Sequence, residues 1–210
     1  MENKRLYTLH RMILRAILLT LTAFFWTLSY GVEKDWDDYT RREREDFAIA
    51  TAYEQSHHSK YRQDCSGFVE AVLKKMGHDV PGFTRSYDVR ANGVRQIYEY
   101  VERSGRLFKK NSPSPGDLIF FSRTYDLNRD RRFNDLLTHI AIVTNVDRDG
   151  TITFIHILQK KIVTDFMNLH KPNVYEENGK ILNSYLRRAQ NNSSSMLTAQ
   201  LFDFFGSLNP

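Results

Sequence analysis

The sequence predicts an α+β fold in which helices come first and antiparallel strands follow. Two observations predict it. Apolar residues recur at helical spacing in the first half of the chain, whereas from about residue 117 onward the apolar spacing falls to two. The strand-like runs are separated by short polar turns, which are typical of hairpins, and they do not alternate with helices. Hydrophobic residues make up 41% of the 210 residues, which excludes a largely disordered chain.

The first residues are expected to be an export signal. Met1 to Arg15 is basic, and the thirteen residues from Ala16 to Leu28 carry no charge. That run is shorter than the roughly 20 residues that a membrane-spanning helix needs, but it suits the core of a signal peptide. Small residues at Ser29 and Gly31 predict cleavage after residue 31. The alternative is an uncleaved helix over residues 9–30 that anchors the chain in the membrane. Both readings place the body of the protein in the periplasm or outside the cell.

Charge gives little support for a nucleic-acid partner. The net charge is +5, but the segment up to residue 31 contributes +3 of it. The remaining chain carries only +2, so the basic surplus is mainly a targeting feature, and nucleic-acid binding is not expected. The sequence leaves the oligomeric state open.

Three helices are predicted before the strands. They run from Thr40 to about Gln55, from Cys65 to Gly77, and from about Asn92 to Arg103. Thr40 and Glu43 form a capping box at the start of the first helix. Asp64 is placed to cap the second helix, and Gly77 is placed to end it.

The strands form the second half of the expected domain, which spans residues 32–190. They are predicted at Leu118–Phe121, His139–Thr144 and Thr151–Leu158, with a further strand expected at Lys161–Asp165. A polar loop covers residues 123–135. Residues 191–210 are expected to be a polar linker and a short apolar tail. The tail is expected to cover the domain's own core or to form a packing strand or a helix end, and partner or membrane binding is the alternative.

Cys65 is the single cysteine of the chain. An exported protein reaches an oxidising compartment, so an unpaired thiol there is either buried and inert or kept for its reactivity. The predicted position in the first turn of a helix favours the thiolate and is expected to lower the thiol pKa. The sequence therefore favours a nucleophile over a core residue at this position.

Two histidines are placed to serve that nucleophile. If residues 147–150 form the turn, Val146 faces Thr151, and His139 and His156 become diagonal neighbours on one face of the sheet. A two-residue turn would place the histidines directly opposite each other, and a register shifted by one residue would send them to opposite faces. His139 begins a strand, so it is expected at a cleft rather than deeply buried. The hypothesis is that His139 is the base and His156 fixes its tautomer.

Four motifs in this order resemble the NlpC-type cysteine peptidases of bacterial cell walls. They are Asp64-Cys65-Ser66-Gly67-Phe68, Pro115-Gly116-Asp117-Leu118-Ile119-Phe120-Phe121, His139-Ile140-Ala141-Ile142-Val143 and Phe154-Ile155-His156. The resemblance covers residues 51–188. It implies a papain-like fold in which the catalytic cysteine opens a helix that packs on an antiparallel sheet. It also implies cleavage of amide bonds in peptidoglycan stem peptides, often next to a γ-linked D-glutamate.

The resemblance also assigns roles to residues. It implies that Cys65, His139 and His156 are catalytic, and that Tyr53 or Tyr61 lines the site, while Ser66 lies at the helix start where backbone N–H groups would stabilise an oxyanion. The chain departs from the family pattern where Ser56-His57-His58 replaces the usual Gly-Gly pair. No metal and no cofactor is expected. The alternatives are a non-catalytic envelope-binding protein on the same fold and an acyltransferase that uses the same three residues.

Overall fold

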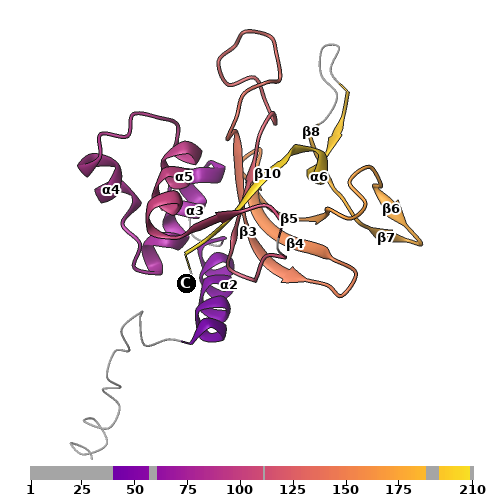
Figure 1. Ribbon diagram of the computed structural model, residues 1–210, viewed down its shortest axis with the longest axis horizontal. Helices are drawn as coiled ribbons and strands as arrows, with labels where there is room; N and C mark the ends of the chain where they lie inside the picture. Colours follow the sequence, from indigo (N-terminus) through magenta and orange to yellow (C-terminus); the bar gives the residue numbers. More distant parts are fainter. Residues whose placement is uncertain (1–39, 57–60, 111, 188–193, 209–210) are drawn as a thin grey trace, which may run out of the picture. The chain divides into compact units, whose positions relative to one another are not determined.

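A computed structural model describes residues 40–56, 61–110, 112–187 and 194–208 (Figure 1). The predicted signal peptide, the pair His57-His58 and most of the predicted linker lie outside these residues. Within them, no helix is both long enough and apolar enough to cross a membrane. The predicted α+β fold is confirmed, because helices precede a six-stranded antiparallel sheet.

Five helices lie in the described part of the chain: α2 (Arg41–Ser56), α3 (Cys65–Lys75), α4 (Val80–Ser86), α5 (Gly93–Ser104) and α6 (Thr198–Leu201). The capping box of α2 is confirmed, since the Thr40 N–H donates to Glu43 Oε2 at 2.7 Å and the Glu43 N–H donates to Thr40 Oγ1 at 3.3 Å. The sequence did not predict α4. That helix has only seven residues, too few to show a helical period, and it depends on its cap, Asp79.

The main sheet has the strand order β1-β10-β2-β3-β4-β5. Its strands are β1 (Arg106–Phe108), β2 (Leu118–Phe121), β3 (His139–Val146), β4 (Thr151–Leu158), β5 (Lys161–Asn168) and β10 (Phe202–Ser207). Two small hairpins accompany it, one of β6 (Glu176–Glu177) and β7 (Lys180–Ile181) and one of β8 (Tyr185–Arg187) and β9 (Met196–Leu197). All four predicted strands are present, and β1 was missed because it has only three residues.

The apolar tail is a strand of the main sheet. β10 lies between β1 and β2, with Phe205 opposite Ile119 on one side and opposite Phe108 on the other. The sheet therefore extends past the expected domain boundary at residue 190, and the tail is an internal part of it. The expectation that the tail forms a packing strand is the one that the pairing supports.

The two faces of the sheet are covered by different elements. Figure 1 shows α3 and α5 on one side and α6 with β8 on the other. Phe120 points to the helical side, where its ring lies 5.7 Å from that of Tyr98 on α5. Its neighbours Ile119 and Phe121 point to the other side and join a core cluster with Leu186 and Leu201. The alternation along β2 thus fills two separate apolar layers.

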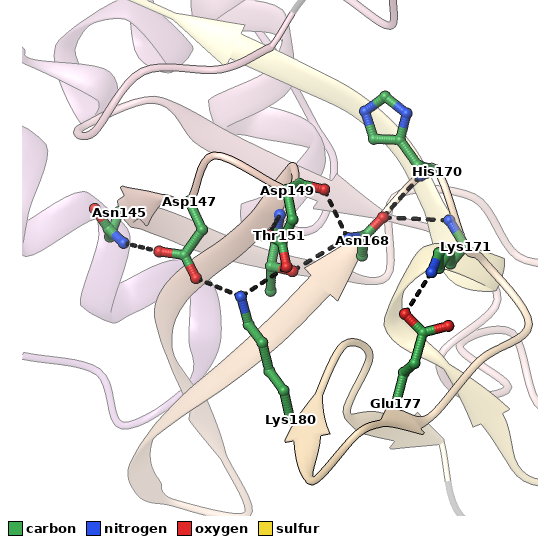
Figure 2. A network of polar contacts seen from close by, with 9 residues as sticks. All are labelled: Asn145, Asp147, Asp149, Thr151, Asn168, His170, Lys171, Glu177 and Lys180. Atoms are coloured by element: carbon green, nitrogen blue, oxygen red, sulfur yellow. Dashed lines mark hydrogen bonds and ion pairs between the residues drawn. The ribbon is translucent and has the colours of Figure 1, made fainter.

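A polar network holds the turn between β3 and β4 (Figure 2). Lys180 Nζ, on β7, lies 2.7 Å from Asp147 Oδ2 and 2.8 Å from Asp149 Oδ2. Asn168 Nδ2, at the end of β5, donates to the Asp149 carbonyl and to Thr151 Oγ1. Hydrogen bonds from Lys180 and Thr151 lower the Asp149 pKa to about 2. The network fixes the end of the hairpin that lies away from the start of β3.

Candidate active site

The register of the β3–β4 hairpin changes along its length. Next to the turn, Val146 pairs with Ile152, not with Thr151 as the sequence analysis expected. The reason is a three-residue turn over 148–150, in which the Asp147 N–H donates to the Thr151 carbonyl and Gly150 adopts a φ of +80°. A bulge between Val143 and Asn145 then shifts the pairing by one residue. Beyond it, Ile142 pairs with Ile155, which is the predicted register.

The bulge brings the two histidines to the same face of the sheet. His139 Nε2 lies 2.7 Å from His156 Nδ1, and the ring centroids are 4.9 Å apart. His156 Nε2 in turn lies 3.0 Å from Oδ2 of Asp165 on β5. The predicted placement of the histidines on one face is confirmed, and the structure extends the pair by one carboxylate.

The hydrogen bonds fix which nitrogen of each ring carries a proton. A carboxylate only accepts, so Asp165 requires a proton on His156 Nε2. His156 Nδ1 is then an acceptor, and His139 Nε2 must be the donor to it. This leaves the lone pair of His139 on Nδ1. A base at this position therefore uses Nδ1 to take a proton, and Nε2 serves to orient the ring.

Burial keeps His139 neutral. The side chain is more deeply buried than the sequence analysis expected from its place at a strand start, with 6% of its surface exposed, and His156 is fully buried. Desolvation, together with the neighbouring His156, lowers the pKa of His139 well below 6.5. A neutral imidazole at neutral pH is the form that can accept a proton.

Cys65 opens α3 as predicted, and a polar turn holds it there. Asp64 Oδ1 accepts from the Gly67 N–H at 2.7 Å and from Ser66 Oγ at 2.9 Å. Arg62 reaches the same turn, since its Nε lies 2.7 Å from Asp64 Oδ2 and its Nη2 lies 2.8 Å from Ser66 Oγ. Arg62 could not be predicted from the sequence, because a salt bridge over two residues leaves no periodic signal.

Close packing leaves this turn no freedom. A Cβ on Gly67 would lie 2.2 Å from the Arg62 carbonyl oxygen, and a Cβ on Gly93 would lie 2.3 Å from Ser66 Oγ. Both glycines are therefore required for close approach of backbone to side chain. The segment 62–67 and the start of α5 fix the place at which the cysteine emerges.

The chemistry of the Cys65 thiol differs from the expectation of a lowered pKa. Burial raises the thiol pKa to about 11, and the charge of Asp64 adds to the increase. Backbone N–H groups of Ile140, Ser66 and Cys65 favour the thiolate but do not outweigh desolvation. The prediction of a lowered pKa was wrong because burial and the charge of Asp64 outweigh the N–H groups at the helix start. In the described structure the sulfur faces these backbone groups.

The other residues expected at the site lie in three different settings. Tyr53 lies on α2 with 44% of its surface exposed. The Tyr61 ring packs 5.8 Å from Phe68, and burial raises its pKa. The Ser66 hydroxyl is occupied by Asp64 and Arg62, so its backbone N–H is the group that faces the sulfur.

A pocket of about 220 Å³ opens beside His139. Its lining comes from the 123–135 loop, from the β4–β5 turn and from β8: Thr124, Tyr125, Phe133, His139, Leu158, Gln159, Tyr185, Leu186 and Arg187. Tyr125 lies near Cys65 and Asp64, since the charges of both residues add to the burial that raises the Tyr125 pKa. Of these residues only His139 was predicted from the sequence, because the loop and β8 residues approach it only through the fold.

Comparison with known proteins agrees with this geometry. The sequence model of the CHAP domain family matches residues 53–157, which contain Cys65, His139 and His156. No curated protein and no solved structure matches the chain. Asp165, Arg187 and β10 lie beyond the matched segment.

Proposed function

The chain belongs to the CHAP domain family of papain-like peptidoglycan hydrolases, and from this premise we propose that it is an exported cysteine hydrolase of peptidoglycan stem peptides. The family match confirms the papain-like resemblance that the four motifs predicted. The proposed reaction is cleavage of a peptide or isopeptide amide through an acyl-enzyme. No cofactor is part of this reaction.

The observation that carries the proposal is the chain of hydrogen bonds from Asp165 through His156 to His139. These hydrogen bonds leave His139 Nδ1 as the acceptor. His139 precedes Ile140 in β3, and the Ile140 backbone contacts the Cys65 sulfur. The buried neutral imidazole of His139 and the half-buried neutral thiol of Cys65 form a base and a nucleophile that carry no charge at rest. The pair suits proton transfer that accompanies attack.

The steps of the reaction follow from these positions. Cys65 Sγ attacks the amide carbonyl carbon as His139 Nδ1 takes the thiol proton. Backbone N–H groups at the start of α3 stabilise the oxyanion, and His139 then gives the proton to the leaving amine. Water attacks the thioester with His139 again as base, which releases the carboxylic acid and restores the thiol.

Export is supported by the sequence of residues 1–31, with its basic start and uncharged core. Peptidoglycan lies outside the cytoplasmic membrane, so a signal peptide and a wall-directed hydrolase belong together. Fractionation of cells that produce the full chain tests this part. Recovery from the periplasm or medium with residue 32 as the new N-terminus is the expected result.

Digestion of purified peptidoglycan tests the enzymatic part. The wild-type protein is expected to release soluble fragments with new amino groups, whereas Cys65→Ala is expected to release none. Arg148→Gln, an exposed change at the far end of the hairpin, is the matched control and should digest like the wild type. Undiminished release by Cys65→Ala would overturn the proposal.

Two other outcomes identify the alternatives. Sedimentation of the wild-type protein with peptidoglycan, without any release of fragments, would indicate a non-catalytic envelope-binding protein. New amide products that form only when an amine acceptor is added would indicate acyl transfer. Mass spectrometry of the products separates hydrolysis from transfer.

A further inference from the structure

The pocket beside His139 contains a buried cation. Arg187, on β8, lines the pocket and has 9% of its surface exposed. Its Nε is buried and has no hydrogen-bond partner within the described ranges. Nor does any described carboxylate form an ion pair with its guanidinium. Burial of a charged group without an opposite charge is costly, so such groups are normally paired.

The surroundings of Arg187 hold it in place but do not neutralise it. Its Nη1 donates to the Arg123 carbonyl oxygen at 3.0 Å, and the guanidinium carbon lies 4.6 Å from the centroid of the Phe133 ring. A second cation, Arg123, is close enough that its charge adds to burial in lowering the Arg187 pKa. The guanidinium is therefore fixed, desolvated and next to another positive charge.

The pocket also lies near Cys65 and His139. Tyr125 lines the same pocket and lies close enough to Cys65 for the charge of the sulfur to act on its hydroxyl. His139 lines the pocket from the other side. An anion beside Arg187 would thus belong to a molecule that also reaches the nucleophile.

We propose that Arg187 binds an ionised carboxylate of the substrate, and that the enzyme therefore distinguishes a free carboxylate from a carboxamide near the scissile bond. This inference rests on the proposed function and deepens it by naming the substrate class. A planar guanidinium donor matches a carboxylate in geometry and charge. The carboxylate would supply both the missing acceptor for Nε and the missing negative charge. A carboxamide could supply only the acceptor.

Two stem tripeptides that differ in one group test the proposal. Both contain a γ-linked D-glutamate, whose α-carboxyl is free in one and amidated in the other. Binding is measured by calorimetry to the Cys65→Ala protein, which requires no turnover. The free acid is expected to bind about 10- to 100-fold more tightly than the amide, the range of a charge-assisted hydrogen bond.

Variants of Arg187 locate the discrimination. In the Cys65→Ala background, Arg187→Gln is expected to bind both peptides equally, Arg187→Lys to retain part of the preference, and the control Arg148→Gln to retain all of it. In the active enzyme, Arg187→Gln should raise KM for the free acid with little change in kcat, because the contact is made equally in ground and transition states.

The outcomes separate this inference from the proposed function. Equal binding of the two peptides to the Cys65→Ala protein overturns the inference even if Arg187→Gln fails to fold. Turnover of both peptides at the same kcat/KM by the wild type leaves the hydrolase intact and removes the role of Arg187. A binding preference without any turnover supports the carboxylate site and overturns the hydrolase.

Discussion

His139 Nε2 and His156 Nδ1 lie 2.7 Å apart, and this contact leaves Nδ1 as the ring nitrogen of His139 that can accept a proton. The orientation of the His139 ring depends on Asp165, which contacts His156. Asp165 fixes the proton on His156, and His156 fixes the proton on His139. Asp165 thus determines the tautomer of His139 through His156.

Asp165→Asn should lower kcat more than it changes KM. The amide of asparagine can donate to His156 Nε2 and favour the wrong tautomer, so a decrease on the order of tenfold to a hundredfold is expected, below the 10²–10⁴ that a complete general base supplies. Steady-state hydrolysis of a stem peptide measures it. Asp149→Asn, at the far turn, is the matched control. An unchanged kcat for Asp165→Asn would remove Asp165 from the site.

The pH profile of kcat/KM should be level through neutrality. Protonation of His139 removes the base, and its lowered pKa places the acid limb well below 6.5. Loss of the thiol proton removes the proton needed by the leaving amine, and this limb lies at about 11. Initial rates at low substrate concentration across the pH range give both limbs. An alkaline limb near 8 would contradict a neutral thiol with a raised pKa.

Asp64→Asn should lower the Cys65 pKa from about 11 and leave the helix cap in place. The asparagine oxygen can still accept from the Gly67 N–H, but the negative charge that disfavours the thiolate is gone. The pH dependence of alkylation by iodoacetamide reports the pKa. Asp79→Asn, which changes the cap of α4 in the same way, should leave the thiol unaffected. Identical alkylation profiles for Asp64→Asn and the wild type would exclude the acidic cap as a cause.

Gly67→Ala should destabilise the protein, although Gly to Ala within a helix ordinarily gains up to about 1 kcal/mol. The new Cβ would lie 2.2 Å from the Arg62 carbonyl oxygen, so the turn before Cys65 must shift. A loss of about 1–3 kcal/mol is expected in the free energy of unfolding, measured in urea. Ala71→Gly, on the same helix, measures the effect of helix propensity alone. A gain in stability for Gly67→Ala would show that the turn is free to move.

The helices and the long strands could be predicted because their signals are local. Caps such as Thr40 and Asp64 and apolar periods are visible within a few residues. The placement of His139 and His156 on one face was also predictable, although the register from which it was predicted holds only beyond the bulge. The register at the turn was wrong by one residue, and the bulge next to Val143, which no local signal marks, restored it.

The rest of the site depends on pairings that the sequence does not mark. Asp165 shares a face with His156 because β4 and β5 are joined at Gln159 and Lys160, two residues with positive φ that lack the usual Asn-Gly signal. Continuing the register across that turn would have found Asp165. No such extension reaches Arg187, which approaches the pocket from a separate hairpin.

The insertion of β10 has a consequence for how the sheet assembles. β1 and β2 are close in sequence, yet neither can pair with the other, because the strand between them is made about 80 residues later. Until residues 202–207 arrive, β2 has an open edge and the ladder that carries His139 has one free side. Contacts between such distant segments slow folding, so the sheet around His139 is completed only after residues 202–207 have been synthesised.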